Sequence, residues 1–213
     1  LYLQNAVDSI KDQTYFLWML TEENLRRTIF PLGGLTKTQV RQIAFEHGYV
    51  ELSKKAESQD ICFIPNNDYR TSLSQQGLHV EPGCYIDSEG KILGSHCGFC
   101  NYTIGQRKGL GIALGAPKHV LKIDAQTNTV VLGDHDELYT CDVQACDVRI
   151  RDMQWLADSP QVTARIHYKS PAISATLQIS PITNDQSPII NVHFDQPVWG
   201  VTPGQSLVIY KDG

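Results

Sequence analysis

The spacing of hydrophobic residues changes from a helical to an alternating period near residue 82. Before that point the segment "KDQTYFLWML" (11–20) is densely apolar. The next segment, "TEENLRRTIF" (21–30), begins with a threonine and two acidic residues, as helices often do, and Phe30-Pro31 is expected to end it. A third helix is expected from Thr36, because Gln39 completes a capping box, and it should close at Gly48. Residues 1–75 are therefore predicted to be mainly helical.

Beyond residue 82 short apolar runs alternate with turn residues. The segments "GCYIDSEGKIL" (83–93) and "HVLKIDAQTNTVVLG" (119–133) each have the pattern of a β-hairpin. Residues 162–168 and 173–179 alternate apolar and polar positions, as a half-buried strand does. Two further strands are expected in "IINVHF" and "PGQSLVIY".

Helices followed by a run of short strands predict an α+β multidomain chain. We expect a helical segment over 1–75, a small central β-rich domain over 76–140, and a C-terminal antiparallel β-barrel over 141–213. Residues 70–82 and 110–118 are the expected linkers.

Composition and charge narrow the class of protein only slightly. The net charge is −5, and Asp and Glu outnumber Lys and Arg in each third of the chain. Contact with an anionic partner would therefore depend on local basic patches. No apolar run reaches the roughly 18 residues that cross a bilayer, and no secretion signal is recognisable. The chain is thus expected to work without a membrane.

Six cysteines raise three possibilities: disulfides, a redox pair or a zinc site. Without a secretion signal, reduced thiols are the better expectation. The pair Cys97 and Cys100 has thioredoxin-like spacing, but the glycine-rich segment after it lacks the helix that this chemistry needs. Joint zinc binding with Cys141 and Cys146 is also disfavoured, because residues five apart on a strand point to opposite faces.

Two glycine-rich segments could approach a ligand closely. Gly109–Gly115 resembles a dinucleotide loop, but Pro117 interrupts the helix that should follow, so a plain loop is favoured. In "TIGQRKG" (103–109), Arg107 and Lys108 lie between glycines and suit phosphate contact. A solvated basic turn explains the same residues equally well.

Two other features stay ambiguous on residue chemistry alone. Arg165, His167 and Lys169 share the polar face of a predicted strand, which is more often a solvent-facing side than an RNA-binding one. Cys62, in "SQDICFIPN" (58–66), has apolar neighbours that favour an inert buried thiol. Nearby Lys54 and Lys55 could instead lower its pKa, so composition leaves packing and catalysis both open.

Four motifs, in this order and at these separations, resemble the tRNA-specific 2-thiouridylase family. They are "KDQTYFL", "SQDICFI", "YTIGQRKGLGI" and "FDQPVWGVTPGQSLVIY". The resemblance covers essentially the whole chain. It implies an enzyme that activates the wobble uridine of certain tRNAs with ATP and Mg²⁺, by adenylating the oxygen at ring position 2. Sulfur carried as a cysteine persulfide then replaces that oxygen.

The resemblance also implies roles for particular residues. Cys62 matches the persulfide-bearing cysteine, consistent with a thiolate's ability to accept sulfur. Asp12 and Gln13 match a pair beside the target nucleotide, where an amide can pair with a uracil edge. The central loop implied to embrace tRNA corresponds to four residues: Gly105, Gln106, Arg107 and Lys108.

Departures from the family pattern limit these expectations. The family's N-terminal nucleotide-binding loop and its second catalytic cysteine have no match, so the chain is expected to be the C-terminal part of a longer enzyme. Its helical segment would then be the end of an α/β catalytic domain, without the ATP site and inactive alone. His167 replaces a common arginine and is assigned no RNA contact.

The implied partners are tRNA and a sulfur-donor protein, either a persulfide relay or a cysteine desulfurase. The implied compartment is the bacterial cytoplasm or the mitochondrial matrix, and no metal site is expected in the chain itself. The alternative is an RNA-binding β-barrel module without catalytic chemistry, in which Cys62 would be unreactive.

Overall fold

The computed structural model describes residues 1–56, 71, 75, 81–150, 154, 161–180 and 188–211. It divides into two compact units. The first comprises Leu1–Ser58, Cys141–Gln196 and Gln205–Gly213, and the second comprises Gln59–Thr140 and Pro197–Gly204. The division into domains at residues 75 and 140 stays a prediction.

The helices of the first unit are short, and two of them, over 22–27 and 37–46, begin where the sequence indicates. They are η1 (Thr14–Phe16), α1 (Glu22–Arg27), α2 (Lys37–Glu46) and α3 (Val50–Lys54). The expected capping box of α2 is present, since the Thr36 side chain accepts from Gln39 N and the Gln39 side chain accepts from Thr36 N. Gly48 follows α2 with φ +85°, a left-handed conformation suited to glycine.

The helix expected over residues 11–20 is wrong, because only the single 3₁₀ turn η1 forms there. Hydrogen bonds to distant backbone and side-chain groups from Tyr15 and Trp18 hold this segment instead. The next helix, α1, ends at Arg27 rather than at the predicted Phe30-Pro31, since Thr28 already has extended backbone angles. No residue of α2 is buried in the structure, so the apolar face of this helix does not pack into a core.

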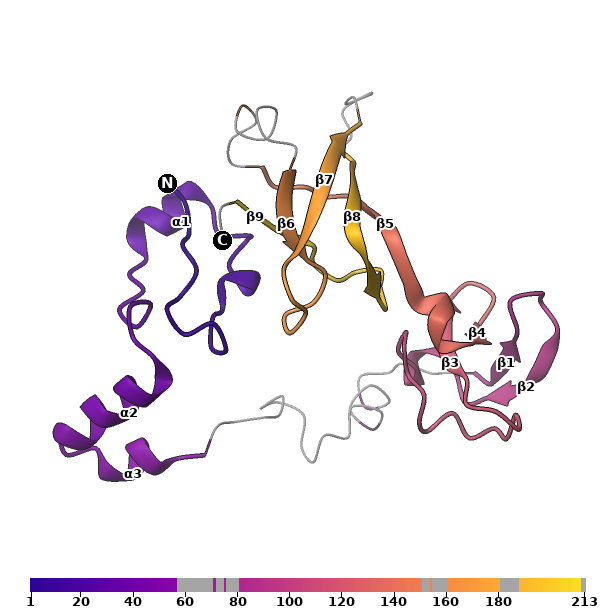
Figure 1. Cartoon of the computed structure of the whole chain (residues 1–213). Coiled ribbons are helices and arrows are strands. Elements are labelled where there is room, and N and C mark those ends of the chain that lie inside the picture. The colour runs from indigo at the N-terminus through magenta and orange to yellow at the C-terminus, as the bar shows by residue number, and fades with distance from the viewer. Residues whose placement is uncertain are drawn as a thin grey trace. The chain divides into compact units, whose positions relative to one another are not determined.

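The strands of the first unit form a five-stranded sheet in the order β5-β8-β7-β6-β9. Strands β6, β7 and β8 lie side by side, and every pairing that involves β6 or β7 is antiparallel (Figure 1). The bounds are β5 (Tyr139–Ala145), β6 (Gln161–Arg165), β7 (Ile173–Ile179), β8 (Ile190–Trp199) and β9 (Val208–Tyr210). The predicted alternation is confirmed in β6, where Val162 and Ala164 are buried between more exposed residues.

The α+β class with a C-terminal, mostly antiparallel β domain is therefore confirmed, with one qualification. The sheet order begins at β5 and ends at β9, so the described strands are barrel-like but do not close. Strand β5 was assumed only in the argument on Cys141 and Cys146, although apolar and polar residues alternate from Tyr139 to Ala145 as in a half-buried strand. No helix in the described part of the chain is long and apolar enough to cross a membrane.

The second unit contains a four-stranded sheet in the order β2-β1-β4-β3. Both predicted hairpins are confirmed: β1 (Gly83–Ile86) pairs with β2 (Ile92–His96), and β3 (His119–Asp124) pairs with β4 (Thr129–Gly133), each antiparallel. Strands β1 and β4 join the hairpins by parallel pairing. Two 3₁₀ turns complete the unit, η3 (Phe99–Asn101) and η4 (His135–Leu138).

Residues 110–118 were expected to be a linker between domains, and this prediction is wrong. Leu110 is buried in the core of the second unit, and Ile112 and Leu114 pack against that core. The Tyr85 hydroxyl donates a 2.6 Å hydrogen bond to Leu110 O and ties the loop to β1. Glycines and a proline marked this segment as a loop, but burial of its leucine and isoleucine side chains holds it on the sheet.

His96 gives the second unit a pH-dependent stability. The side chain is 4% exposed, and Nδ1 accepts a 2.9 Å hydrogen bond from Gly98 N, which requires an unprotonated Nδ1. Burial lowers the pKa of His96 below its usual value. This histidine therefore contributes its full stability above the unfolded-state pKa of about 6.5, and that stability is lost as the pH falls below it.

We expect hydrogen exchange at the amides of β1 and β2 to accelerate as the pH falls from neutral toward 5, after correction for intrinsic exchange rates. His96→Asn should reduce this loss of protection, because the amide oxygen can still accept from Gly98 N and does not titrate. Burial also lowers the pKa of His119, so some pH dependence should remain. The control is the substitution His47→Asn, at a histidine that is exposed to solvent. Equal pH dependence in the two variants would contradict the role of His96.

Candidate functional site

The residues of the "KDQ" motif divide between the interior and the surface of the first unit. Asp12 is only 3% exposed. Its Oδ1 accepts from Ala6 N at 3.0 Å, and its Oδ2 accepts from the Thr14 hydroxyl at 2.6 Å. Gln13 is exposed at the start of η1, and its side chain makes no capping hydrogen bond there. Asp12 therefore shapes the turn, and Gln13 is available to a ligand.

Two aromatic side chains fix this turn to the five-stranded sheet. The buried Tyr15 hydroxyl donates to Ser206 O at 2.7 Å, and Ile166 O lies 3.3 Å away. Trp18 Nε1 donates to Ser206 Oγ at 2.8 Å. Burial raises the pKa of Tyr15, so its hydroxyl remains a donor at physiological pH. Ser206 lies in the C-terminal motif, so two of the family-like motifs meet within this unit.

The loop from Thr103 to Gly109 is braced by its own glutamine. Gln106 Oε1 accepts from Thr103 N at 3.0 Å, and Gln106 Nε2 donates to Lys108 O at 3.0 Å. The backbone adds two bonds to β3, with Gly105 N donating to Val120 O and Val120 N donating to Gln106 O. Since both ends of its amide are used within the loop, Gln106 acts as an internal brace here.

Gly105 lies against the indole ring of Trp199. Its φ is +83°, and a Cβ placed there would lie 2.4 Å from Trp199 Cη2. A side chain would therefore meet both backbone strain and a ring held in place by its neighbours. Sequence reasoning found the glycine but missed Trp199, because nothing local to either segment indicates this contact.

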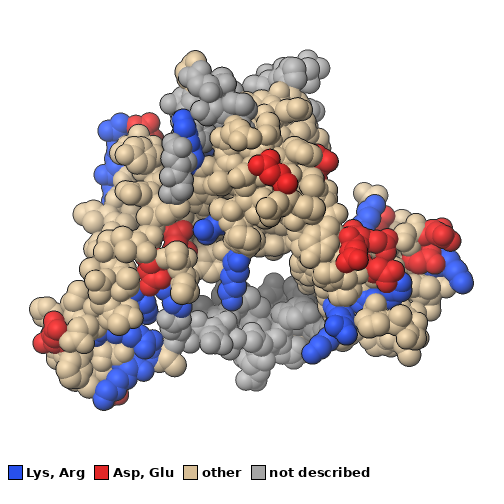
Figure 2. Space-filling model, in the orientation of Figure 1, with Lys and Arg blue, Asp and Glu red and all other residues tan. Residues whose placement is uncertain are grey.

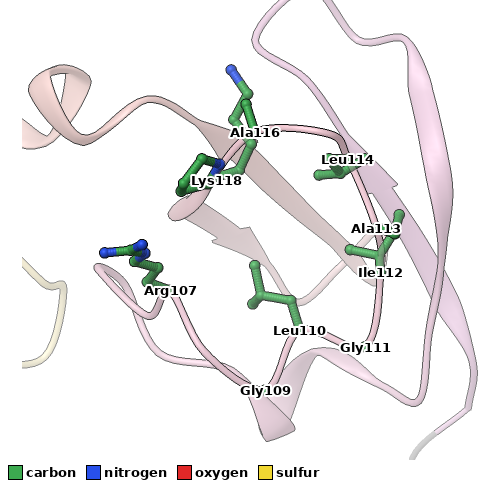
Figure 3. A pocket seen from close by; sticks show the side chains of 10 residues that line it. Arg107, Gly109, Leu110, Gly111, Ile112, Ala113, Leu114, Ala116 and Lys118 are labelled. Atoms are coloured by element: carbon green, nitrogen blue, oxygen red, sulfur yellow. The ribbon is translucent and has the colours of Figure 1, made fainter.

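The bracing leaves Arg107 and Lys108 exposed at the tip of the loop. Neither makes a salt bridge with any residue the structure describes. Arg107 and Lys118 both line a cavity of about 440 Å³, into which Leu110 points (Figure 3). Guanidinium and ammonium groups beside glycine backbone can bind phosphate. In Figure 2 both signs of charge are spread over the visible face, so such a contact would be local.

The N-termini of the described helices α1 and α2 do not provide a site for a nucleoside triphosphate. The N-terminus of α2 is already satisfied, because Lys37 N donates to Asp8 Oδ2 at 2.8 Å and Thr36 forms its capping box. That bond from Lys37 N is the largest cause of the lowered pKa of Asp8. The first turn of α1 carries Glu22 and Glu23, which repel phosphate. The N-termini of α1 and α2 therefore do not suit the phosphates of ATP.

The cysteines in the described ranges are free thiols: Cys84, Cys97, Cys100, Cys141 and Cys146. Cys97 and Cys100 flank the start of η3, a turn of three residues that gives a thiolate no helix N-terminus. The described part of the chain holds no cluster of three or more metal-binding side chains. Cys62 lies outside the described residues, so its assignment still depends on its motif.

Three family models match consecutive parts of the chain. Residues 1–66 match the tRNA methyl transferase HUP domain, 72–134 the tRNA methyl transferase PRC-barrel domain, and 145–213 the aminomethyltransferase beta-barrel domain. Together these matches follow the order of the family-like motifs along the chain.

Curated relatives carry one name, tRNA-specific 2-thiouridylase MnmA. The chain is 44% identical to that of Natranaerobius thermophilus over 211 residues, which are 99% of this chain and 56% of the relative. It is 42% identical over 209 residues to that of Acetivibrio thermocellus, covering 98% of this chain and 56% of the relative. It is 44% identical over 211 residues to that of Herpetosiphon aurantiacus, covering 99% of this chain and 57% of the relative. The chain thus spans a little over half the length of these relatives, and it belongs to the tRNA-specific 2-thiouridylase family.

Proposed function

We propose that this chain binds tRNA and carries sulfur for a tRNA 2-thiouridylase acting on the wobble uridine. The observation that carries the proposal is the self-braced loop, which leaves Arg107 and Lys108 exposed and without a salt bridge in the described structure. In a family of tRNA-modifying enzymes, two such cations beside glycine backbone suit the phosphates of the substrate.

The proposed contacts follow the division between buried and exposed residues. Gln13 would meet the target nucleotide, and Asp12 would hold the turn that presents it. Arg107 and Lys108 would bind the tRNA backbone. Gly105 and Gln106, which were expected to share in tRNA contact, are proposed to shape the loop.

The proposed sulfur carrier is Cys62, loaded as a persulfide by a cysteine desulfurase or a persulfide relay. Its terminal sulfur would bond to C2 of the uridine as the activated oxygen leaves. A second protein thiolate would then attack the Cys62 sulfur, leaving 2-thiouridine on the tRNA and a disulfide on the protein. The two electrons that reduce the transferred sulfur come from the two thiolates. A reducing thiol must restore both cysteines before another cycle.

ATP with Mg²⁺ would supply the adenylation that activates the oxygen, at a site other than the described residues. Alone, the chain is therefore proposed to be inactive in thiolation. The proposed compartment is the bacterial cytoplasm, or the mitochondrial matrix for an organellar source. We also propose that the chain has three domains, divided at residues 75 and 140. The residues proposed to contact tRNA lie in the first two of these domains.

The test is a chimera in which residues 1–213 replace the matching region of the Natranaerobius thermophilus relative. Expressed in a bacterial strain deficient in wobble thiolation, the chimera should restore 2-thiouridine, measured by mass spectrometry of digested tRNA. A folded chimera that binds tRNA and forms no 2-thiouridine would contradict the proposal. That result would favour an RNA-binding module without chemistry.

Arg107→Ala is expected to weaken binding of unmodified tRNA to the 213-residue chain by about fivefold to tenfold. Removing one phosphate contact should also reduce the magnitude of the negative slope of log affinity against log salt concentration by about 0.7–0.9. Fluorescence anisotropy at several salt concentrations measures both quantities. The matched control is Lys122→Ala, which removes an exposed cation from β3 of the same unit. An equal effect of the two substitutions would contradict a specific role for the loop.

A further inference from the structure

Four aromatic rings gather beside the cationic loop of the second unit, with His135 at their centre. The His135 ring lies 5.8 Å from that of Trp199, centroid to centroid, with 28° between the ring planes, which is a stacked arrangement. The rings of His119 and Tyr139 meet His135 edge-on at 5.2 Å and 5.5 Å. The four residues belong to β3, η4, the start of β5 and the end of β8.

Two of the four rings, His135 and Tyr139, are open to solvent. The His135 side chain is 50% exposed and Tyr139 is 46% exposed. The η4 turn is held without the His135 ring, through the capping box between Asp134 and Glu137 and the buried Leu138. His135 therefore contributes little to holding the turn, and its aromatic surface is available to a partner.

The cluster and the loop share structural support. Trp199 stacks on His135 and also packs against Gly105, the glycine that begins the turn before Arg107. Gly200 N donates to Leu138 O at 3.0 Å, which joins the end of η4 to the segment after Trp199. The charge of Arg107 also contributes to lowering the pKa of His119, after burial and His135. The exposed rings therefore share Trp199 with the loop that carries Arg107.

The charges around His135 indicate which part of a nucleotide would fit. Asp136 Oδ1 lies 3.1 Å from His135 Nδ1, and Asp134 pairs with Lys118 at 2.9 Å. Glu137 adds a third carboxylate to the same turn. This negative charge disfavours a phosphate at His135 but not the uncharged face of a base. Proteins that bind single-stranded RNA commonly stack bases on exposed aromatic rings and hold phosphates on nearby cations.

We propose that His135 and Tyr139, supported by Trp199, form a stacking site for an unpaired base of the tRNA. The adjoining phosphate would be held by Arg107. This site rests on the proposed tRNA-binding function and adds a contact to the base. It would favour a single-stranded loop or end of the tRNA over a duplex, because only an unstacked base can reach a protein ring.

The test measures binding of unmodified tRNA to variants of the 213-residue chain by fluorescence anisotropy. His135→Ala should raise the dissociation constant about tenfold, within the range found for loss of one base–aromatic stack. Its salt dependence should match that of the unmodified chain, because a base stacked on the ring adds no phosphate contact. His135→Phe should bind within about twofold of the unmodified chain, because the ring surface is kept.

The matched control is His193→Ala, in the five-stranded sheet. His193 is also exposed, with a 61% exposed side chain, and its Nδ1 lies 2.7 Å from Asp142 Oδ1. This substitution should leave tRNA affinity unchanged. A photoreactive benzoylphenylalanine at position 135, but not at 193, should crosslink to an unpaired segment of the tRNA.

The proposal is overturned if His135→Phe binds as weakly as His135→Ala, or if the crosslink at position 135 is absent or maps to a duplex. Equal effects of the substitutions at 135 and 193 would also overturn it. Absence of tRNA binding by the unmodified chain would contradict the proposed function itself, so the two failures are distinguishable.

Discussion

Cys62→Ser is expected to abolish 2-thiouridine formation by the chimera. A serine hydroxyl cannot hold a sulfane sulfur under these conditions, and it is not ionised near neutral pH. The two side chains have nearly the same size, so the protein should fold and bind tRNA as before. Mass spectrometry of digested tRNA measures the product, and anisotropy shows whether binding persists.

Two exposed cysteines provide matched controls for this substitution. Cys97→Ser and Cys146→Ser remove surface thiols that lie outside the four family-like motifs, and both variants should retain thiolation. Normal thiolated tRNA from the Cys62→Ser chimera would rule out the assigned role. Loss of thiolation in all three variants would point to a general loss of folded enzyme rather than to one carrier.

Gly105→Ala is expected to give the largest loss of tRNA binding among substitutions in the loop. An L-residue in the left-handed region costs about 1–2 kcal/mol. The new Cβ would also lie 2.4 Å from Trp199 Cη2, and overpacking of this kind costs about 1–3 kcal/mol. Since Arg107 and Lys108 follow directly, the loop should move and tRNA affinity should fall by a factor on the order of ten to a hundred.

The substitution Gly111→Ala separates the effect of backbone strain from the effect of contact with Trp199. Gly111 also has a positive φ, +71°, but a Cβ there meets no atom within 4 Å. This control should show the cost of backbone strain alone, as a smaller decrease in thermal stability and in tRNA affinity. Indistinguishable effects of the two substitutions would show that contact with Trp199 does not shape the loop.

Local chemistry made much of the fold predictable. The capping box of Thr36 and Gln39 depends on neighbours three positions apart, and the hairpin over 83–93 depends on its own turn. The segment at 11–20 was mispredicted because the polar groups of Tyr15 and Trp18 find partners far along the chain. An apolar composition alone does not distinguish a helix from a segment anchored to a sheet.

The candidate site was predictable as a set of residues but not as a set of roles. The family resemblance pointed to Gly105–Lys108 together, whereas the geometry separates a brace, Gln106, from the exposed cations. Nothing in the motif itself distinguishes buried Asp12 from exposed Gln13. These distinctions depend on hydrogen bonds and burial that form only when distant segments meet.

The most direct measurement is to locate sulfane sulfur on the chimera after incubation with a cysteine desulfurase and free cysteine. Mass spectrometry of peptides prepared without reductant identifies the loaded cysteine. The additional sulfur should be on the peptide containing Cys62 and should disappear when tRNA and ATP are added, as 2-thiouridine forms. Sulfur found only on other cysteines, or retained on Cys62 while 2-thiouridine accumulates, would contradict the account.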